Sequence, residues 1–198
     1  MVFFIVYFFI AYLLGSISSA ILLCRCTGQP DPRAQGSGNP GASNILRIAG
    51  KKMAATVLLL DILKGWLPVM IANKLGMPIT MSAWVLFFSF LGHLFPIFFQ
   101  FRGGKGVATA LGGLLALCWP IAVFTSLVWL LVFFMFRYIS VASILAAIAT
   151  LVVALVSLPL SVNLPIFCVS TLLVARHHAN IARLRTGAEP KLRRTPTV

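Results

Sequence analysis

Five long apolar stretches constrain this 198-residue chain more than any other feature of its sequence. They cover residues 1–23, 53–73, 79–99, 107–136 and 138–175, and few charged side chains interrupt them. A helix of about 20 apolar residues is long enough to cross the hydrocarbon core of a bilayer. Because lipid offers no hydrogen-bond partners to an exposed backbone, we predict an all-α integral membrane protein.

Composition argues against a separate soluble domain. Charged residues make up 10% of the chain, whereas soluble domains carry about 25%. We therefore treat residues 1–198 as a single polytopic membrane domain. The net charge of +13 does not suggest nucleic acid, because the cations lie at the ends of apolar stretches. It indicates anionic lipid, an anionic substrate or membrane topology. The four cysteines show no metal or redox spacing, so we predict no bound metal.

Positive charges predict how the chain is oriented. Loop 24–52 carries five Lys or Arg residues, loop 100–106 carries two and the tail from residue 176 carries six, whereas segment 74–78 carries one. Cytoplasmic loops are enriched in Lys and Arg, so the first three segments should share the cytoplasmic side. This parity predicts about seven transmembrane helices, with the N-terminus outside, the C-terminus in the cytoplasm and two short spans within 107–136. Five longer, tilted spans are the alternative.

A glycine-rich stretch with two cations separates two of the apolar segments. Arg102 and Lys105 alternate there with Gly103, Gly104 and Gly106. Glycine lets backbone amides approach a ligand closely, and a helix that begins directly afterwards would point its positive end at the same place. The residues therefore indicate a phosphate-binding loop at the membrane edge. The spacing is not that of a Walker A motif. A positively charged turn between two helices is the alternative.

A second polar segment, residues 31–47, is rich in glycine, asparagine and proline and should form a loop. Its remaining side chains are mainly hydroxyls, amides and arginines, which donate hydrogen bonds to an anion. We interpret it as a second anion-binding element, with an ordinary linker as the alternative.

Two further groups of polar residues stand out. Asp61 and Lys64 lie within an apolar stretch at a spacing that puts them on one helix face, where they can pair. They either support a site or form a structural ion pair. His93, near the end of the next stretch, is interpreted as a structural hydrogen-bonding residue. In the tail, His177 and Asn180 should point the same way from one helix face.

The sequence contains no Ser-His-Asp set, no carboxylate pair and no metal-binding signature. Any chemistry must therefore use a substrate that is already activated. A small transporter for organic phosphates would also need cations and helices interrupted by glycine. Such a protein would place its charges near the bilayer midplane, where only the Asp61–Lys64 pair is predicted here. A purely structural membrane subunit would leave the polar stretches unexplained.

Three polar stretches together resemble the bacterial membrane family of acyl-phosphate:glycerol-3-phosphate acyltransferases. They are residues 36–44, residues 92–109 and residues 176–189, and the segment around Asp61 and Lys64 is similar to the second span of that family. The resemblance covers nearly the whole chain, and the stretches occur in the same order.

Small departures from the family pattern occur at three positions. Ser43 and Arg102 stand where Thr and Lys are expected, and Ser18 stands where Pro is common. None of them removes a donor that the reaction needs.

The resemblance implies a reaction in which a fatty acyl group moves from acyl phosphate to the sn-1 hydroxyl of glycerol 3-phosphate. The products are lysophosphatidic acid and phosphate, in the first acylation step of bacterial phospholipid synthesis. No cofactor and no covalent acyl-enzyme are implied. The implied location is the bacterial cytoplasmic (inner) membrane, with a multi-pass chain and the active site facing the cytoplasm. Membrane lipids and the soluble enzyme that makes acyl phosphate are candidate partners.

The motifs and the resemblance together predict the residues of the site. The predicted catalytic residues are Ser37, Arg47, Lys105, Ser143, His177 and Asn180. The predicted substrate- and phosphate-binding residues are Gly36, Gly38, Asn39, Gly41, Asn44, Gly103, Gly104, Gly106 and Thr109. The predicted supporting residues are Asp61, Lys64, His93, Arg183 and Glu189. The general base is left open between His177 and the phosphate of the donor substrate.

Overall fold

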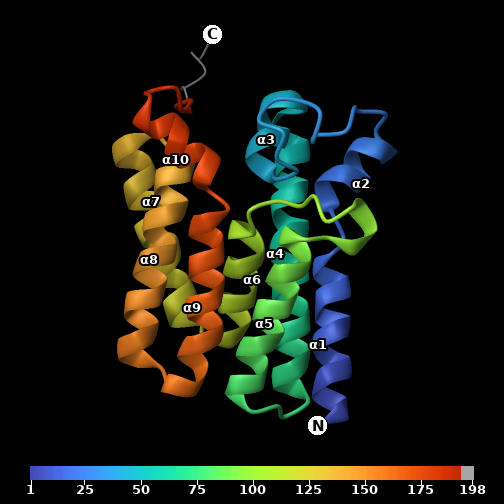
Figure 1. Ribbon diagram of the computed structural model, residues 1–198, viewed down its shortest axis with the longest axis vertical. Coiled ribbons are helices and arrows are strands. Elements are labelled where there is room, and N and C mark those ends of the chain that lie inside the picture. The colour runs from blue at the N-terminus through green and yellow to red at the C-terminus, as the bar shows by residue number, and fades with distance from the viewer. Residues whose placement is uncertain (193–198) are drawn as a thin grey trace.

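The computed structural model describes residues 1–192, and this part of the chain is helical without any strand (Figure 1). The helices are α1 (Val2–Gly15), α2 (Ser19–Cys26), α3 (Ala42–Ile48), α4 (Gly50–Lys74), α5 (Ile79–Leu94), the 3-10 turn η1 (Ile97–Phe99), α6 (Val107–Leu117), α7 (Trp119–Phe136), α8 (Ile139–Ser157), α9 (Leu160–Ala175) and α10 (His178–Arg185). The predicted all-α architecture is therefore confirmed. Arg193 and Arg194, two cations of the predicted cytoplasmic tail, lie outside the described residues.

Four elements are long and apolar enough to cross a membrane, namely α4, α5 together with η1, α7 and α8. The bent pairs α1–α2 (43°) and α9–α10 (47°) also qualify if each is counted as one span, which gives up to six. Helix α6 is apolar but has only 11 residues, so it is about 16 Å long and reaches roughly half-way across the hydrocarbon core. The count of seven requires α6 as the seventh element and stays a prediction.

The polar segments gather at one end of the molecule. Helices α3 and α10 lie there together with the loops that precede α3 and α6, and the N-terminus lies at the opposite end (Figure 1). The amide of Leu192 donates to the carbonyl of Arg137 at 3.0 Å, so the turn between α7 and α8 lies at this end too. This is the common face that the distribution of positive charge predicts.

Glycines let two pairs of helices cross at backbone distance. A Cβ at Gly15 of α1 would overlap the carbonyl oxygen of Ser89 in α5, and a Cβ at Gly65 of α4 would overlap that of Thr109 in α6. The opposing glycine of each pair, Gly92 or Gly112, is equally close to the partner backbone. Small residues at crossings of this kind are the usual basis of helix packing in membranes, where apolar surface gives no driving force between helices.

The bundle has two halves, α1–α6 and α7–α10, and buried side chains join them over only part of their length. Phe90 and Leu94 of α5 pack with Leu114 of α6 and with Val169 and Leu173 of α9, and all five are at most 5% exposed. Helices α7–α10 stand beside α1–α6 (Figure 1). The space between these halves is not filled towards the polar end, and a cavity lies there.

Candidate active site

A cavity of about 520 Å³ opens between the two halves of the bundle. Its polar end is lined by side chains from three stretches that are distant in sequence: Ser37, Asn39, Ser43 and Arg47; His93 and Lys105; and His177, Asn180 and Glu189. Its deeper part is lined mainly by small and apolar residues: Ala110, Leu111, Leu114, Thr125, Ala146, Ala147, Thr150, Val169 and Ser170. The site thus combines a polar head region with an apolar limb that descends among α6, α7, α8 and α9.

The loop before α3 is held in shape by one buried amide. The side chain of Asn44 accepts from the amide of Ser37 at 2.8 Å and donates to the carbonyls of Pro32 and Gln35 at 3.0 Å each. Asn44 is fully buried and does not line the cavity. The structure therefore gives Asn44 a loop-forming position and not the direct ligand contact expected from sequence.

Other residues of this loop divide between lining and supporting positions. Ser37, Asn39, Gly41 and Arg47 line the cavity, whereas Gly36 and Gly38 do not. Both of these glycines have positive φ, at 59° and 71°, which allows the loop to turn back on itself.

An ion pair that the sequence did not predict fastens this loop to η1, which leads directly into the glycine–lysine loop (residues 100–106). Arg33 pairs with Asp31 at 2.7 Å and donates to the carbonyl of Phe99 at 2.9 Å. The two residues are close in sequence and therefore looked like ordinary loop charges.

The glycine–lysine loop uses part of its backbone for its own support. The amide of Gly104 donates to the carbonyl of His93 at 3.1 Å, so it is not free to bind a phosphate as expected. Gly103 and Gly104 do not line the cavity, whereas Gly106 and Lys105 do. The predicted residue Thr109 is 1% exposed and stands behind the cavity wall.

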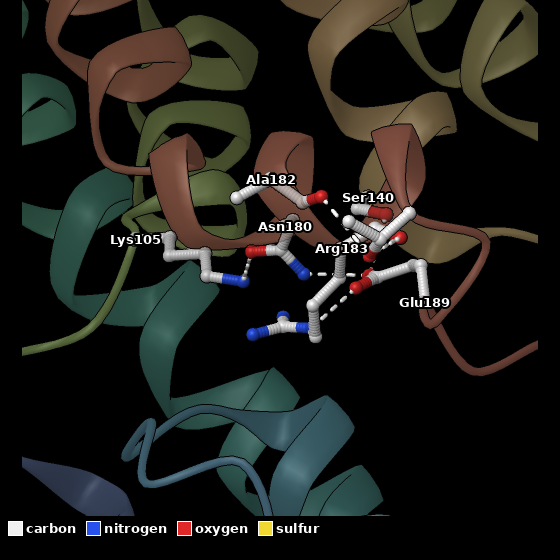
Figure 2. A network of polar contacts seen from close by, with 7 residues as sticks. Lys105, Ser140, Asn180, Ala182, Arg183 and Glu189 are labelled. Carbon is white, nitrogen blue, oxygen red and sulfur yellow. Dashed lines mark hydrogen bonds and ion pairs between the residues drawn. The ribbon is translucent and has the colours of Figure 1, made fainter.

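A polar network connects Lys105 to the C-terminal segment (Figure 2). The Lys105 ammonium donates to Asn180 Oδ1 at 2.5 Å, and Asn180 Nδ2 donates to Glu189 at 2.6 Å. Glu189 also accepts from the Ser140 hydroxyl at 2.7 Å and from Arg183 at 2.8 Å. Ala182 borders this network in Figure 2. Glu189 and Arg183, which the sequence predicts as supporting residues, thus pair with each other.

Burial and neighbouring charges set the protonation of this network. Burial lowers the pKa of Lys105 to about 8, with further lowering by Arg183, Arg47 and Arg176, while Glu189 raises it. Burial opposes the charge of Glu189, but the hydrogen bonds from Asn180, Ser140 and Arg183 outweigh it and hold the pKa below its usual value. At neutral pH the network therefore contains an ammonium and a carboxylate.

His177 is oriented by the end of α9. Its Nδ1 donates to the carbonyl of Leu173 at 2.8 Å, and the ring is 2% exposed. A carbonyl accepts only, so a neutral His177 carries its proton on Nδ1 and an unprotonated lone pair on Nε2. His177 lines the cavity, so it is available as a hydrogen-bond acceptor or a base.

Ser143 lies on α8 at the cavity wall, as part of a local hydrogen-bond chain. Its hydroxyl donates to the carbonyl of Ile139 at 2.8 Å and accepts from the indole of Trp129 at 3.1 Å. One lone pair of the hydroxyl oxygen is left for a ligand. The contact with Trp129 could not be predicted from sequence, because Trp129 lies on α7 and Ser143 on α8.

A buried ion pair between Asp61 and Lys64 lies beside the cavity, and its Asp61 lines the cavity wall. Lys64 pairs with Asp61 at 2.8 Å, as the spacing predicts, and donates to the carbonyl of Ile17 at 2.9 Å. The Ser19 hydroxyl also donates to Asp61. His93 Nδ1 lies 3.7 Å from Asp61 without a hydrogen bond. The pair therefore supports α4 against α2 and α5 while Asp61 and His93 face the cavity.

Within residues 1–192, no group of three or more His, Cys, Asp or Glu side chains is arranged to hold a metal ion. Two residues with polar contacts around the site were not predicted as site residues, namely Ser140, which donates to Glu189, and Arg176, which donates to the carbonyls of Gly103 and Gly104. Ser140 carries no sequence signal, since its partner lies 49 positions away. Arg176 precedes His177 in the third polar stretch, and this adjacency was its only signal.

The sequence of this chain is similar to those of known proteins over nearly its whole length. The family model described as glycerol-3-phosphate acyltransferase matches residues 5–187. A glycerol-3-phosphate acyltransferase of Pasteurella multocida (strain Pm70) is 48% identical over 188 residues, which is 95% of this chain and 93% of the relative. A glycerol-3-phosphate acyltransferase of Pseudomonas fluorescens (strain Pf-5) is 49% identical over 179 residues, which is 90% of this chain and 94% of the relative.

Two crystal structures share the fold over nearly its full length. Both are of PlsY (YgiH), an integral membrane glycerol 3-phosphate acyltransferase. The glycerol 3-phosphate form has a TM-score of 0.92 and 41% identity, covering 96% of each chain. The lysophosphatidic acid form has a TM-score of 0.89 and 40% identity, covering 96% of this chain and 95% of the other.

Proposed function

Because the chain belongs to the glycerol-3-phosphate acyltransferase family, we propose that it acylates the sn-1 hydroxyl of glycerol 3-phosphate with a long-chain acyl phosphate. The products are lysophosphatidic acid and inorganic phosphate. The related crystal structures, a glycerol 3-phosphate form and a lysophosphatidic acid form, support the substrate and the product of this reaction. In a bacterium this reaction is the first acylation step of phospholipid synthesis.

One observation carries the proposal, namely the two-part cavity. Its polar end collects cations and hydrogen-bond donors, which suits two phosphate-bearing molecules. Its apolar limb descends into the membrane part of the bundle, which suits an alkyl chain. A substrate with a phosphate at one end and a long chain at the other therefore matches the site from end to end.

The proposed binding roles follow the cavity lining. Lys105 binds one phosphate and stabilises the charge that develops as the phosphate leaves. Ser37, Asn39 and Arg47 bind the other, with the Arg47 guanidinium as a two-pronged donor. Asn180 holds the Lys105 ammonium in place from the opposite side.

The remaining expected contacts also have positions in this scheme. Ser143 adds a hydroxyl from α8, and Gly106 lets the chain pass close to the ligand. Arg183, Glu189 and the Asp61–Lys64 pair support the walls.

The chemistry proposed is direct transfer. The sn-1 oxygen attacks the carbonyl carbon, the bond from that carbon to the phosphate oxygen breaks, and phosphate leaves with the electron pair. An acyl phosphate is a mixed anhydride and already activated, so the reaction needs neither a covalent acyl-enzyme nor a cofactor. Two of the serines that line the cavity, Ser143 and Ser140, donate to a backbone carbonyl and to the Glu189 carboxylate, respectively.

The hydroxyl proton has two possible acceptors in this scheme, the Nε2 atom of His177 and the leaving phosphate. The Nδ1 hydrogen bond of His177 supports the first, because it leaves Nε2 unprotonated. The balance of the reaction is the same in both cases, since the proton finally resides on phosphate.

We also propose that residues 1–198 act as one polytopic domain of the bacterial cytoplasmic membrane, with the cavity facing the cytoplasm. The gathering of the polar loops at one end supports this orientation. Membrane lipids surround the domain, and the soluble enzyme that makes acyl phosphate is its proposed supplier.

The test uses purified protein in lipid vesicles with palmitoyl phosphate and glycerol 3-phosphate. We expect phosphate and lysophosphatidic acid in equal amounts, and no product from palmitoyl-CoA. Lys105→Ala should lower kcat/KM by about 100-fold or more, because a charge-stabilising donor is lost. Lys74→Ala, on the same chain at the opposite end of α4, should act like the unaltered protein. Turnover with palmitoyl-CoA alone would refute the donor assignment.

The same assay identifies the base. If His177→Ala keeps near-normal kcat at saturating substrates, the proton goes directly to phosphate. A loss of about 100-fold or more in kcat, with an unchanged thermal unfolding midpoint, assigns the proton to His177.

A further inference from the structure

Arg176 occupies a position that the proposed reaction leaves unexplained. Its Nη2 donates to the carbonyl oxygen of Gly103 at 3.0 Å, and its Nη2 and Nε both donate to that of Gly104 at 3.3 Å. The guanidinium carbon lies 5.5 Å from the ring centroid of Phe95. Arg176 does not line the cavity. The side chain is therefore fixed against the back of the glycine–lysine loop, away from the ligand.

The loop that Arg176 holds has few other supports. It follows Gln100 and Phe101, two non-glycine residues in the left-handed region with φ of 60° and 58°. Such residues are uncommon and persist only where surrounding contacts hold them. From α5, the carbonyl of His93 accepts the amide of Gly104 at 3.1 Å. From the end of α9, Arg176 binds the carbonyls. The loop is thus clamped from both halves of the bundle.

Lys105 follows this clamp directly, and its ammonium bonds to Asn180, four residues after Arg176. The α9–α10 bend therefore holds the loop backbone at one side and the end of the lysine side chain at the other. We propose that Arg176 is a positioning residue, which fixes the Gly103–Gly104 carbonyls so that Lys105 meets a substrate phosphate. The inference rests on the proposed function.

The geometry requires an arginine and not only a positive charge. A guanidinium is planar and presents several fixed N–H donors, so it can bind two adjacent carbonyls at once. A lysine at residue 176 keeps the charge but offers a single mobile ammonium. A glutamine keeps one donor group and loses the charge. Comparing Arg176→Lys with Arg176→Gln therefore separates geometry from charge.

Arg185 provides a matched control. It is an exposed arginine on the same C-terminal helix, α10, and it has no hydrogen bond or ion pair among the described residues. We expect Arg176→Lys and Arg176→Gln to lower kcat/KM for palmitoyl phosphate by about tenfold or more, since a charged two-pronged contact is lost. Arg185→Gln should stay within about twofold, because its side chain faces water.

The pH profile of kcat/KM distinguishes positioning from a merely structural role, because a structural role would not shift the alkaline limb in one Arg176 variant and leave it in place in the other. The charged groups that act on Lys105 are Glu189, Arg183, Arg47 and Arg176. Removing the Arg176 charge should raise the pKa of Lys105, so the alkaline limb of kcat/KM should move to higher pH in Arg176→Gln. Arg176→Lys keeps the charge and should leave the limb in place while activity falls.

A binding measurement separates this inference from the proposed function. Calorimetric titration with inorganic phosphate, the leaving group that Lys105 is proposed to bind, needs no acyl donor, so it reports on the Lys105 site even if acyl phosphate is the wrong donor. We expect weaker binding in both Arg176 variants. If wild type binds inorganic phosphate but does not turn over acyl phosphate, only the donor proposal fails.

Phe95→Leu covers the case in which the Arg176 variants do not fold. It removes the ring beside the guanidinium and leaves the hydrogen bonds of Arg176 to Gly103 and Gly104, so we expect a smaller loss of binding and of kcat/KM. The inference is overturned if Arg176→Lys binds and reacts like wild type. It is also overturned if both variants, or Phe95→Leu in their place, lose activity only in proportion to the folded fraction.

Discussion

Lys105 is the residue whose charge depends most on its surroundings in the polar network. Burial brings the pKa of its ammonium to about 8, well below the ordinary lysine value, although Glu189 favours the charge. A phosphate ligand would favour the charged form further. The residue is therefore poised to lose its proton in the free enzyme under mildly alkaline conditions, and to retain it when substrate is bound.

A pH profile tests this directly. Since the folded pKa of Lys105 is depressed, the ammonium is lost as pH rises through about 8, and kcat/KM for palmitoyl phosphate should fall about tenfold per pH unit above that value. The alkaline limb of kcat should lie at higher pH, because a bound substrate phosphate stabilises the protonated form of Lys105. Steady-state rates from pH 6 to 10 provide the measurement.

Lys105→Arg is the control for the pH profile, since a guanidinium stays charged throughout this range. We expect lower activity from the altered geometry but no alkaline limb. An unchanged limb in this variant would assign the titration to another group.

Among the helices, the close crossing of α4 and α6 positions the site. Gly65 lets α4 contact the backbone of Thr109, and α6 begins directly after the glycine–lysine loop. Any change in this crossing moves the start of α6 and with it Lys105. The glycine therefore acts on the site from inside the membrane, without contact to the ligand.

Gly65→Ala should destabilise the protein by about 1–3 kcal/mol, because the added methyl overlaps backbone atoms that cannot yield. The measurement is the thermal unfolding midpoint in detergent, beside residual activity. Leu59→Phe adds more bulk on the same helix at a position that is 56% exposed, and it should leave the midpoint unchanged. Equal midpoints for Gly65→Ala and wild type would contradict the close crossing.

For the whole molecule, the proposed orientation predicts which end is reached from the cytoplasm. Cys26, the last residue of α2, is exposed, and α2 lies at the end of the molecule where the polar loops gather (Figure 1). A membrane-impermeant thiol reagent should label it in inside-out vesicles and not in intact cells. Leu75→Cys, in the exposed turn after α4, should show the reverse pattern. Labelling of Cys26 in intact cells would invert the proposed topology.

Much of this architecture was predictable, because each strong signal is local. Long apolar stretches indicate membrane helices, the spacing of Asp61 and Lys64 indicates their pairing, and the three polar stretches indicate the family. Contacts between distant segments have no such signal. The bond of Arg176 to the glycine loop, and the bond of Ser140 to Glu189, depend on how helices dock.

Two expectations fell short for the same reason. Asn44 looked like a ligand-binding amide, and Gly104 looked like a free backbone donor. In the structure both are used for folding the loops themselves. A loop that must hold a fixed shape uses some of its hydrogen-bond donors to bind its own backbone, and the sequence does not show which donors these are.

The position of Glu189 has a consequence for how the protein is made. Synthesis proceeds from the N-terminus, and domains gain their contacts in that order. Lys105 is synthesised early, but Asn180 and then Glu189 emerge about 75 residues later or more. A nascent chain therefore exposes a half-built, unanchored cation for much of its translation. The polar network is complete only after Glu189 has left the ribosome.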